Sequence, residues 1–267
     1  MDKEDYEEPC CPFKTPDKKE RVDIGRVISK LDEYLNVKDY DSCERHLIYW
    51  LTEAKEKQDD HSCLTIYNEQ VGLYRKIQKE KECLTAIESA LNLVEKMGSN
   101  NTISLGTTYL NCATGYKAFD KDEKALELYK KAKVIYEKEL DKSDSRLAGL
   151  YNNMAVAYMD LKYFSESEIL FNNALSILEN KDNNLDCAIT YCNLCDLYYA
   201  KDGIEKAKSK IADFLFNAYN ILNDEKIVKD GYYAFVCEKC ALTFNYYGYE
   251  KIEKDLLERA KEIYERA

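Results

Sequence analysis

The sequence predicts an all-helical chain built from a stack of about six antiparallel helix pairs. Three observations favour this fold class. Tyrosine recurs at an interval of 40–42 residues, and alanine recurs at a 42-residue interval in a second position. The three prolines all lie within the first 16 residues, so the rest of the chain lacks the residue that most strongly interrupts a helix. Fixed periods of about 20–50 residues are typical of repeat architectures.

Residues 1–21 are expected to form a flexible tail. The segment is charged, contains every proline and shows no helical period. The adjacent Cys10 and Cys11 are interpreted as two exposed thiols, with a redox or metal role as the alternative.

Residues 22–267 are expected to form the repeats. The leading tyrosines are Tyr67, Tyr109, Tyr151 and Tyr191, and a second tyrosine follows each by seven residues: Tyr74, Tyr116, Tyr158 and Tyr198. The alanine positions are Ala90, Ala132 and Ala174. Within one unit, Tyr151, Met154, Ala155 and Tyr158 have the i, i+3, i+4, i+7 spacing of one helix face.

The units follow one another with short polar turns between them. The expected helix pairs occupy residues 24–60, 64–100, 106–142, 148–182, 188–222 and 234–267. Turn-forming residues lie at 98–101, 141–145, 181–184 and 223–224, where turns between units are required.

This pattern resembles the tetratricopeptide repeat. The unit that begins at Tyr151 continues with Ser167, Phe171 and Ala174, where small residues let paired helices approach and the aromatic ring fills the gap. The resemblance implies a right-handed superhelical solenoid. The period of 40–42 residues and the missing proline at the end of the second helix indicate longer helices, similar to the kinesin-light-chain type of repeat.

The resemblance also implies a ligand groove lined by the first helix of each pair. Two residues after the leading tyrosines stand Glu69, Asn111, Asn153 and Asn193. In similar repeat domains this position bonds the backbone of an extended peptide, and an amide offers both a donor and an acceptor for that purpose. The alternative is that the asparagines cap or bridge neighbouring helices.

Further groove positions are expected one turn along the same helices. Arg75, Lys76 and Lys117 could meet an acidic group. An adaptable aromatic wall is expected nearer the C-terminus, from Met159, Tyr199, Asn245 and Tyr246. The two-carboxylate clamp of chaperone-adaptor repeats is not expected, because Thr65, Thr107 and Gly149 occupy positions where it needs an anchor.

Two C-x-x-C pairs raise the question of a metal site. They are Cys192 with Cys195 and Cys237 with Cys240. Both pairs lie within predicted helices at small or apolar positions of the repeat, so core packing is favoured over a zinc site. No cofactor is expected. The sequence also lacks the P-loop, dinucleotide, nucleophile-elbow and zinc-protease motifs, so no enzyme is predicted.

Composition limits the partners. A formal charge of −11 argues against nucleic acid, which is bound mainly by clustered Lys and Arg. No apolar stretch reaches about 18 residues, and the acidic start is unlike a signal peptide, so neither a membrane span nor secretion is expected. The eleven cysteines are then interpreted as reduced thiols in the cytoplasm.

The expected function is a non-enzymatic scaffold that binds a protein or an extended peptide. One alternative is an intracellular peptide-sensing regulator of the bacterial quorum-sensing type, without a DNA-binding domain of its own because only about 21 residues precede the repeats. Another is a metal- or redox-responsive protein that uses the C-x-x-C pairs. Homo-oligomerisation through the groove or the ends of the stack is left open.

Overall fold

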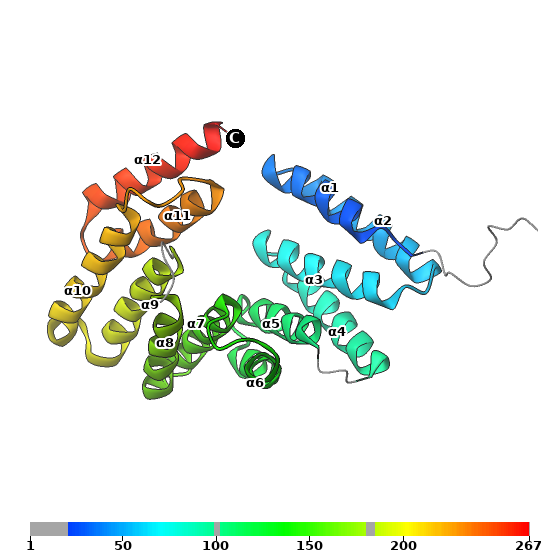
Figure 1. The fold of residues 1–267 in the computed structure, drawn as a ribbon, viewed down its shortest axis with the longest axis horizontal. Coiled ribbons are helices and arrows are strands. Elements are labelled where there is room, and N and C mark those ends of the chain that lie inside the picture. Colours follow the sequence, from blue (N-terminus) through cyan, green and yellow to red (C-terminus); the bar gives the residue numbers. More distant parts are fainter. Residues whose placement is uncertain (1–20, 99–101, 180–184, 267) are drawn as a thin grey trace, which may run out of the picture. The chain divides into compact units, whose positions relative to one another are not determined.

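The computed structural model describes residues 21–98, 102–179 and 185–266. Over these ranges the chain forms twelve α-helices and no strand (Figure 1), which confirms the all-helical fold class. Cys10, Cys11 and nearly all of the predicted tail lie outside the described residues, as do most of the predicted turns at 98–101 and 181–184.

The helices form six consecutive pairs, as the repeat pattern predicts. The first helices are α1 (Ile24–Asn36), α3 (Asp60–Lys76), α5 (Ile103–Lys117), α7 (Ser145–Asp160), α9 (Leu185–Asp202) and α11 (Gly231–Tyr246). The second helices are α2 (Tyr40–Glu56), α4 (Glu80–Met97), α6 (Asp122–Glu139), α8 (Phe164–Leu178), α10 (Ile204–Leu222) and α12 (Glu250–Arg266). Five first helices begin three or four residues before the unit boundaries expected from the sequence.

The early starts have a physical reason in helix capping. Before several helices, an acidic or hydroxyl side chain accepts a hydrogen bond from a backbone N–H of the first turn, which would otherwise lack a partner. The capping residues are Asp23, Asp39, Asp59, Thr102, Asp144 and Asp230. The first helices α3, α5, α7 and α11 therefore extend to their caps, before the first residue of the apolar pattern.

The second tyrosine of a unit marks the end of the first helix. The carbonyl oxygens of Tyr74, Tyr116 and Tyr158 each accept a backbone hydrogen bond from the residue five positions later, at 2.9–3.1 Å. The residue just before each donor has a left-handed backbone, for example Lys162 with a φ of 64°. This arrangement is the Schellman motif, which ends a helix and turns the chain sharply into the next one.

The core lies between the helices of each pair. Ala90, Ala132 and Ala174 are fully buried, and so are Ala113 and Ala155 on the first helices. Ser167 on α8 donates a 2.8 Å hydrogen bond from Oγ to the Ala155 carbonyl on α7, which joins two paired helices at a small-residue contact. The small residues therefore set how closely the paired helices approach, as expected from the repeat.

The helices fall into two compact units. The smaller unit, Met1–Met97, holds α1 to α4, and each of these helices packs on the next. The larger unit, Gly98–Ala267, holds α5 to α12. In the larger unit the first helices α5, α7, α9 and α11 also contact one another in turn and form a layer of their own, which we call the first-helix layer.

Candidate functional site

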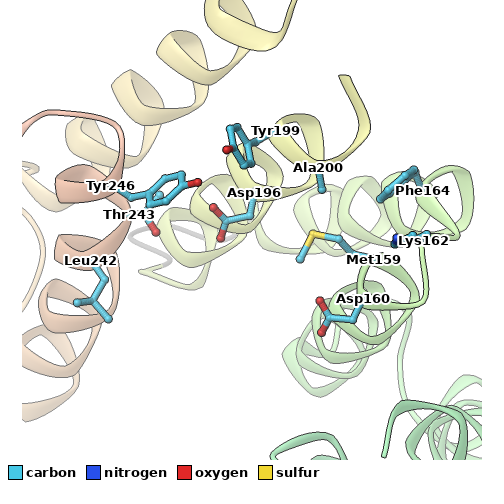
Figure 2. Close-up of a pocket in the computed structure, with 10 residues that line it drawn as sticks. All are labelled: Met159, Asp160, Lys162, Phe164, Asp196, Tyr199, Ala200, Leu242, Thr243 and Tyr246. Carbon is cyan, nitrogen blue, oxygen red and sulfur yellow. The ribbon is translucent and has the colours of Figure 1, made fainter. Parts of the chain in front are cut away.

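The larger unit has a cavity of about 640 Å³ at its first-helix layer (Figure 2). Three consecutive helix pairs contribute to its wall. The lining residues are Met159 and Asp160 of α7, Lys162 and Phe164 at the start of α8, Asp196, Tyr199 and Ala200 of α9, and Leu242, Thr243 and Tyr246 of α11. A volume of this order suits a small molecule or a few side chains of a partner.

The repeat register places several of these residues. Met159 and Tyr199 each lie eight positions after a leading tyrosine, so both come from the same part of successive first helices. The structure brings these two residues of the expected aromatic wall together with Tyr246. Asn245 does not line the cavity and is exposed at the end of α11.

Asp196 is not among the site residues predicted from the sequence, although it departs from the repeat pattern. The equivalent residues of the two preceding units are Thr114 and Val156, so a carboxylate at this point of α9 departs from the repeat. The Tyr247 hydroxyl donates to Asp196 Oδ1 at 3.2 Å. Burial raises the pKa of Asp196, and this hydrogen bond only partly opposes the shift.

A second carboxylate, Asp160, lines the same cavity but is already paired. Lys117 Nζ lies 2.6 Å from Asp160 Oδ2 and 3.4 Å from Asp122 Oδ1. Burial acts to lower the pKa of Lys117, but the hydrogen bonds and charges of these two aspartates raise it overall. The Lys117 ammonium, predicted to contact a ligand, is thus held by two carboxylates of its own chain.

Three tyrosines form an aromatic cluster beside Asp196. The ring centroids of Tyr199 and Tyr246 are 5.5 Å apart, those of Tyr246 and Tyr247 are 5.1 Å apart, and those of Tyr199 and Tyr247 are 6.3 Å apart. All three contacts are edge-to-face, which is a favourable geometry for aromatic pairs. Tyr199 and Tyr246 remain partly exposed, so their rings are available to a ligand.

The three predicted asparagines lie on successive helices of the first-helix layer. Asn111, Asn153 and Asn193 are half-buried on α5, α7 and α9, and none of them lines the cavity. The neighbouring Asn152 bridges two first helices, because its Nδ2 donates to Thr190 Oγ1 at 2.6 Å. A helix-bridging asparagine therefore exists in α7, one position before the predicted ladder residue.

The remaining predicted groove residues, Glu69 and Arg75, belong to α3 of the smaller unit. Glu69 is half-buried, and burial followed by the charge of Asp32 raises the pKa of its carboxyl group. Arg75 is exposed in the last turn of α3. Lys76, next to it, places its ammonium 5.7 Å from the centre of the Tyr40 ring.

The four cysteines of the C-x-x-C pairs are buried thiols on α9 and α11. Burial raises the pKa of Cys195 and of Cys237, and Cys195 donates to the Ile211 carbonyl at 3.7 Å. In the described ranges, no group of three or more His, Cys, Asp or Glu side chains is arranged to hold a metal ion. Likewise, no helix in that part of the chain has the length and apolar character needed to span a membrane.

No protein-family model and no curated protein sequence matches this chain. Its fold does match solved structures. NprR in complex with its cognate peptide NprX is 16% identical with a TM-score of 0.59, over 89% of this chain and 66% of NprR. The apo quorum sensor NprR from B. thuringiensis is 14% identical with a TM-score of 0.57, over 89% of this chain and 63% of that one.

A third match comes from another class of protein. The nearly identical TPR-like repeats of a kinesin-light-chain candidate from Podosopora anserina are 17% identical with a TM-score of 0.52, over 75% of this chain and 94% of theirs. At such identities the likeness concerns the fold, and the chain spans just under two thirds of the length of NprR. The twelve helices in six consecutive pairs, together with these matches, give the chain a tetratricopeptide-like repeat fold.

Proposed function

We propose that this protein is a non-enzymatic binding module that holds a peptide, or an extended segment of a partner protein, on the first-helix layer of its larger unit. The observation that carries the proposal is the cavity of about 640 Å³, whose wall combines three successive helix pairs. A wall that combines apolar and aromatic side chains with a few polar groups is typical of ligand sites.

Exposed apolar side chains on α11 support this proposal. Tyr232, Phe235, Leu242 and Tyr246 are 46%, 40%, 68% and 62% exposed. They lie on one face of the helix. Phe235, Leu242 and Tyr246 follow Tyr232 by three, ten and fourteen positions, spacings that bring residues to the same side of an α-helix. Leu242 and Tyr246 of this stripe line the cavity. Contiguous exposed apolar side chains of this kind often mark a contact surface for a partner.

The three asparagines extend the proposed surface along the layer. Asn111, Asn153 and Asn193 lie on α5, α7 and α9, which contact one another in turn. We propose that their amides bond the backbone of the bound segment, while the cavity takes its side chains. An amide suits this role because it pairs with any peptide bond, whatever the sequence.

The fold comparison supports a peptide as the occupant. NprR was solved with its cognate peptide NprX, so a protein of similar fold is known to hold a peptide. The narrower proposal, a peptide-sensing regulator, is favoured by the likeness to a quorum sensor. Both proposals need the same first step, which is peptide binding at this layer.

A peptide library tests the proposal. We would select random dodecapeptides on the purified protein and measure the affinity of the enriched peptides by calorimetry. The double variant Tyr199→Ala with Tyr246→Ala, and the triple variant with Asn111, Asn153 and Asn193 changed to Ala, should each weaken binding at least about tenfold. Phe216→Ala is the matched control, because Phe216 is 64% exposed on α10 and does not line the cavity.

The expected result is enrichment, loss of affinity in both variants and an unchanged control. If no peptide is enriched, the proposal is wrong. Peptides that bind the cavity variant as tightly as the wild type would move the binding surface away from α7, α9 and α11. Thermal melting of each variant would show that lost affinity does not reflect lost folding.

A further inference from the structure

We propose that the cavity takes a basic side chain of the bound peptide, an arginine or a lysine, with its cationic group against Asp196 and the rings of Tyr199 and Tyr246, and its methylene stem along Leu242. This inference rests on the proposed function and names the chemistry that the peptide must supply.

Asp196 is an anion without a cation of its own. Its carboxylate points into the space bordered by Met159, Thr243 and Tyr246 (Figure 2). The hydrogen bond from the Tyr247 hydroxyl is neutral, and no ion pair between described residues includes Asp196. A half-buried carboxylate without a counter-ion loses hydration that one neutral hydrogen bond only partly replaces, and an entering cation would compensate for the rest.

The other charges of the cavity do not neutralise Asp196. Asp160 is held by Lys117 at 2.6 Å, and the same ammonium lies 3.4 Å from Asp122, so Lys117 is already engaged by two carboxylates. Lys162 also lines the cavity, but it lies at the far end beside Phe164, away from Asp196 (Figure 2). An acidic ligand at the α9–α11 end would meet the Asp196 carboxylate directly, and two like charges in a partly buried site repel each other strongly.

The aromatic cluster next to Asp196 favours the same class of ligand. Tyr199 and Tyr246, whose ring centroids are 5.5 Å apart, are 39% and 62% exposed beside the carboxylate. Aromatic faces attract ammonium and guanidinium groups, and a planar guanidinium also stacks on them. Leu242, which is 68% exposed, offers an apolar surface for the methylene stem of the same side chain.

A substitution that removes the charge of Asp196 but keeps the shape of its side chain tests this inference. It is measured on peptides enriched by the wild-type protein. We expect those peptides to share one arginine or lysine position. Asp196→Asn should weaken their binding about tenfold or more, because it removes the partner of a partly buried charge. A peptide with norleucine at the shared position should bind wild type and Asp196→Asn alike. Asp213→Asn is the matched control, since it removes the same charge from an exposed position on α10 outside the cavity.

The outcomes separate this inference from the proposed function. Suppose that the enriched peptides bind the Tyr199→Ala, Tyr246→Ala variant more weakly than wild type but share no basic residue. This result would overturn the inference and leave the proposed function standing. Unchanged affinity in Asp196→Asn would overturn it as well, as would enriched acidic peptides whose binding depends on Lys162. If no peptide is enriched at all, both proposals fail. The melting temperature of Asp196→Asn should equal or exceed that of wild type, because a poorly hydrated charge is removed.

Discussion

Two carboxylates on first helices, Glu69 and Asp196, are half-buried, and neither belongs to an ion pair between described residues. Burial raises the pKa of both groups, in Glu69 together with the charge of Asp32. The two residues differ in surroundings. Asp196 faces a cavity with exposed aromatic rings, which gives it a proposed ligand, whereas Glu69 lies on α3 near a second acid. We therefore expect the charge of Glu69 to affect the stability of the folded protein.

Glu69→Gln should stabilise the protein near neutral pH. Because the pKa of Glu69 in the folded chain lies above its ordinary value of 4.5, the folded state binds this proton more tightly than the unfolded state does. The charged carboxylate thus costs stability above the folded pKa, and this cost vanishes as the pH falls below 4.5. We expect a higher melting temperature for Glu69→Gln near pH 7 and little difference near about pH 4.

Thermal unfolding followed by circular dichroism at the two pH values checks this prediction. Glu88→Gln, at an exposed position of α4, is the control for loss of one surface charge in the same unit. A lower melting temperature for Glu69→Gln at neutral pH would mean that the Glu69 charge is compensated in the folded protein.

A small residue faces a large one where α5 packs on α6. A Cβ atom on Gly106 of α5 would lie 2.7 Å from Tyr136 Cε1 and 3.2 Å from Ile135 Cγ2, both on α6. The Tyr136 ring is 1% exposed, and its hydroxyl lies 2.8 Å from Thr107 Oγ1, so the ring has little freedom to move away. At the same repeat positions, the next pair has Ala148 and Leu178, a larger residue on the first helix and a smaller one on the second.

Gly106→Ala should therefore destabilise the protein although alanine favours helices. Overpacking costs about 1–3 kcal/mol, and the gain in helix propensity offsets roughly 1 kcal/mol of it. Gly149→Ala is the matched control, because it lies inside α7 and an added Cβ meets nothing within 4 Å. That control should gain about 0.5–1 kcal/mol. Urea unfolding of both variants measures the difference, and equal changes of the same sign would contradict the predicted contact.

At the scale of the whole molecule, the cavity and the asparagine ladder belong to one of the two units. The residues that line the cavity run from Met159 to Tyr246, and the asparagines run from Asn111 to Asn193, all within the larger unit of Gly98–Ala267. In repeat proteins, stability comes mainly from each repeat and its contacts with its neighbours, so an uninterrupted block of repeats retains most of its own stabilising contacts.

A fragment that starts at residue 102 should fold and bind by itself. We expect a helical circular-dichroism spectrum, cooperative thermal unfolding and an affinity for the enriched peptides within about threefold of the full chain. The full-length protein is the control in both measurements. A fragment that folds but binds more than about tenfold weaker would show that the site needs residues from the smaller unit.

The sequence alone determined the fold class, the number of helix pairs and part of the cavity wall. The tyrosine and alanine positions repeat every 40–42 residues. Because these residues pack between helices that are close in the chain, their pattern predicts the helix pairs directly. The same register brought Met159 and Tyr199 into the predicted wall, and both line the cavity. The right-handed superhelical course stays a prediction.

Only the tertiary structure decided the electrostatics of the site. Lys117 pairs with Asp160 across two helix pairs, and Tyr247, just after α11, bonds Asp196; these contacts join residues 43 and 51 positions apart. Such contacts depend on where side chains of different pairs meet, which local periodicity does not specify. Charges interact according to their distance and burial, and both are set by the packing of successive pairs. For this reason the repeat pattern predicted a binding surface, whereas its isolated carboxylate emerged only from the fold.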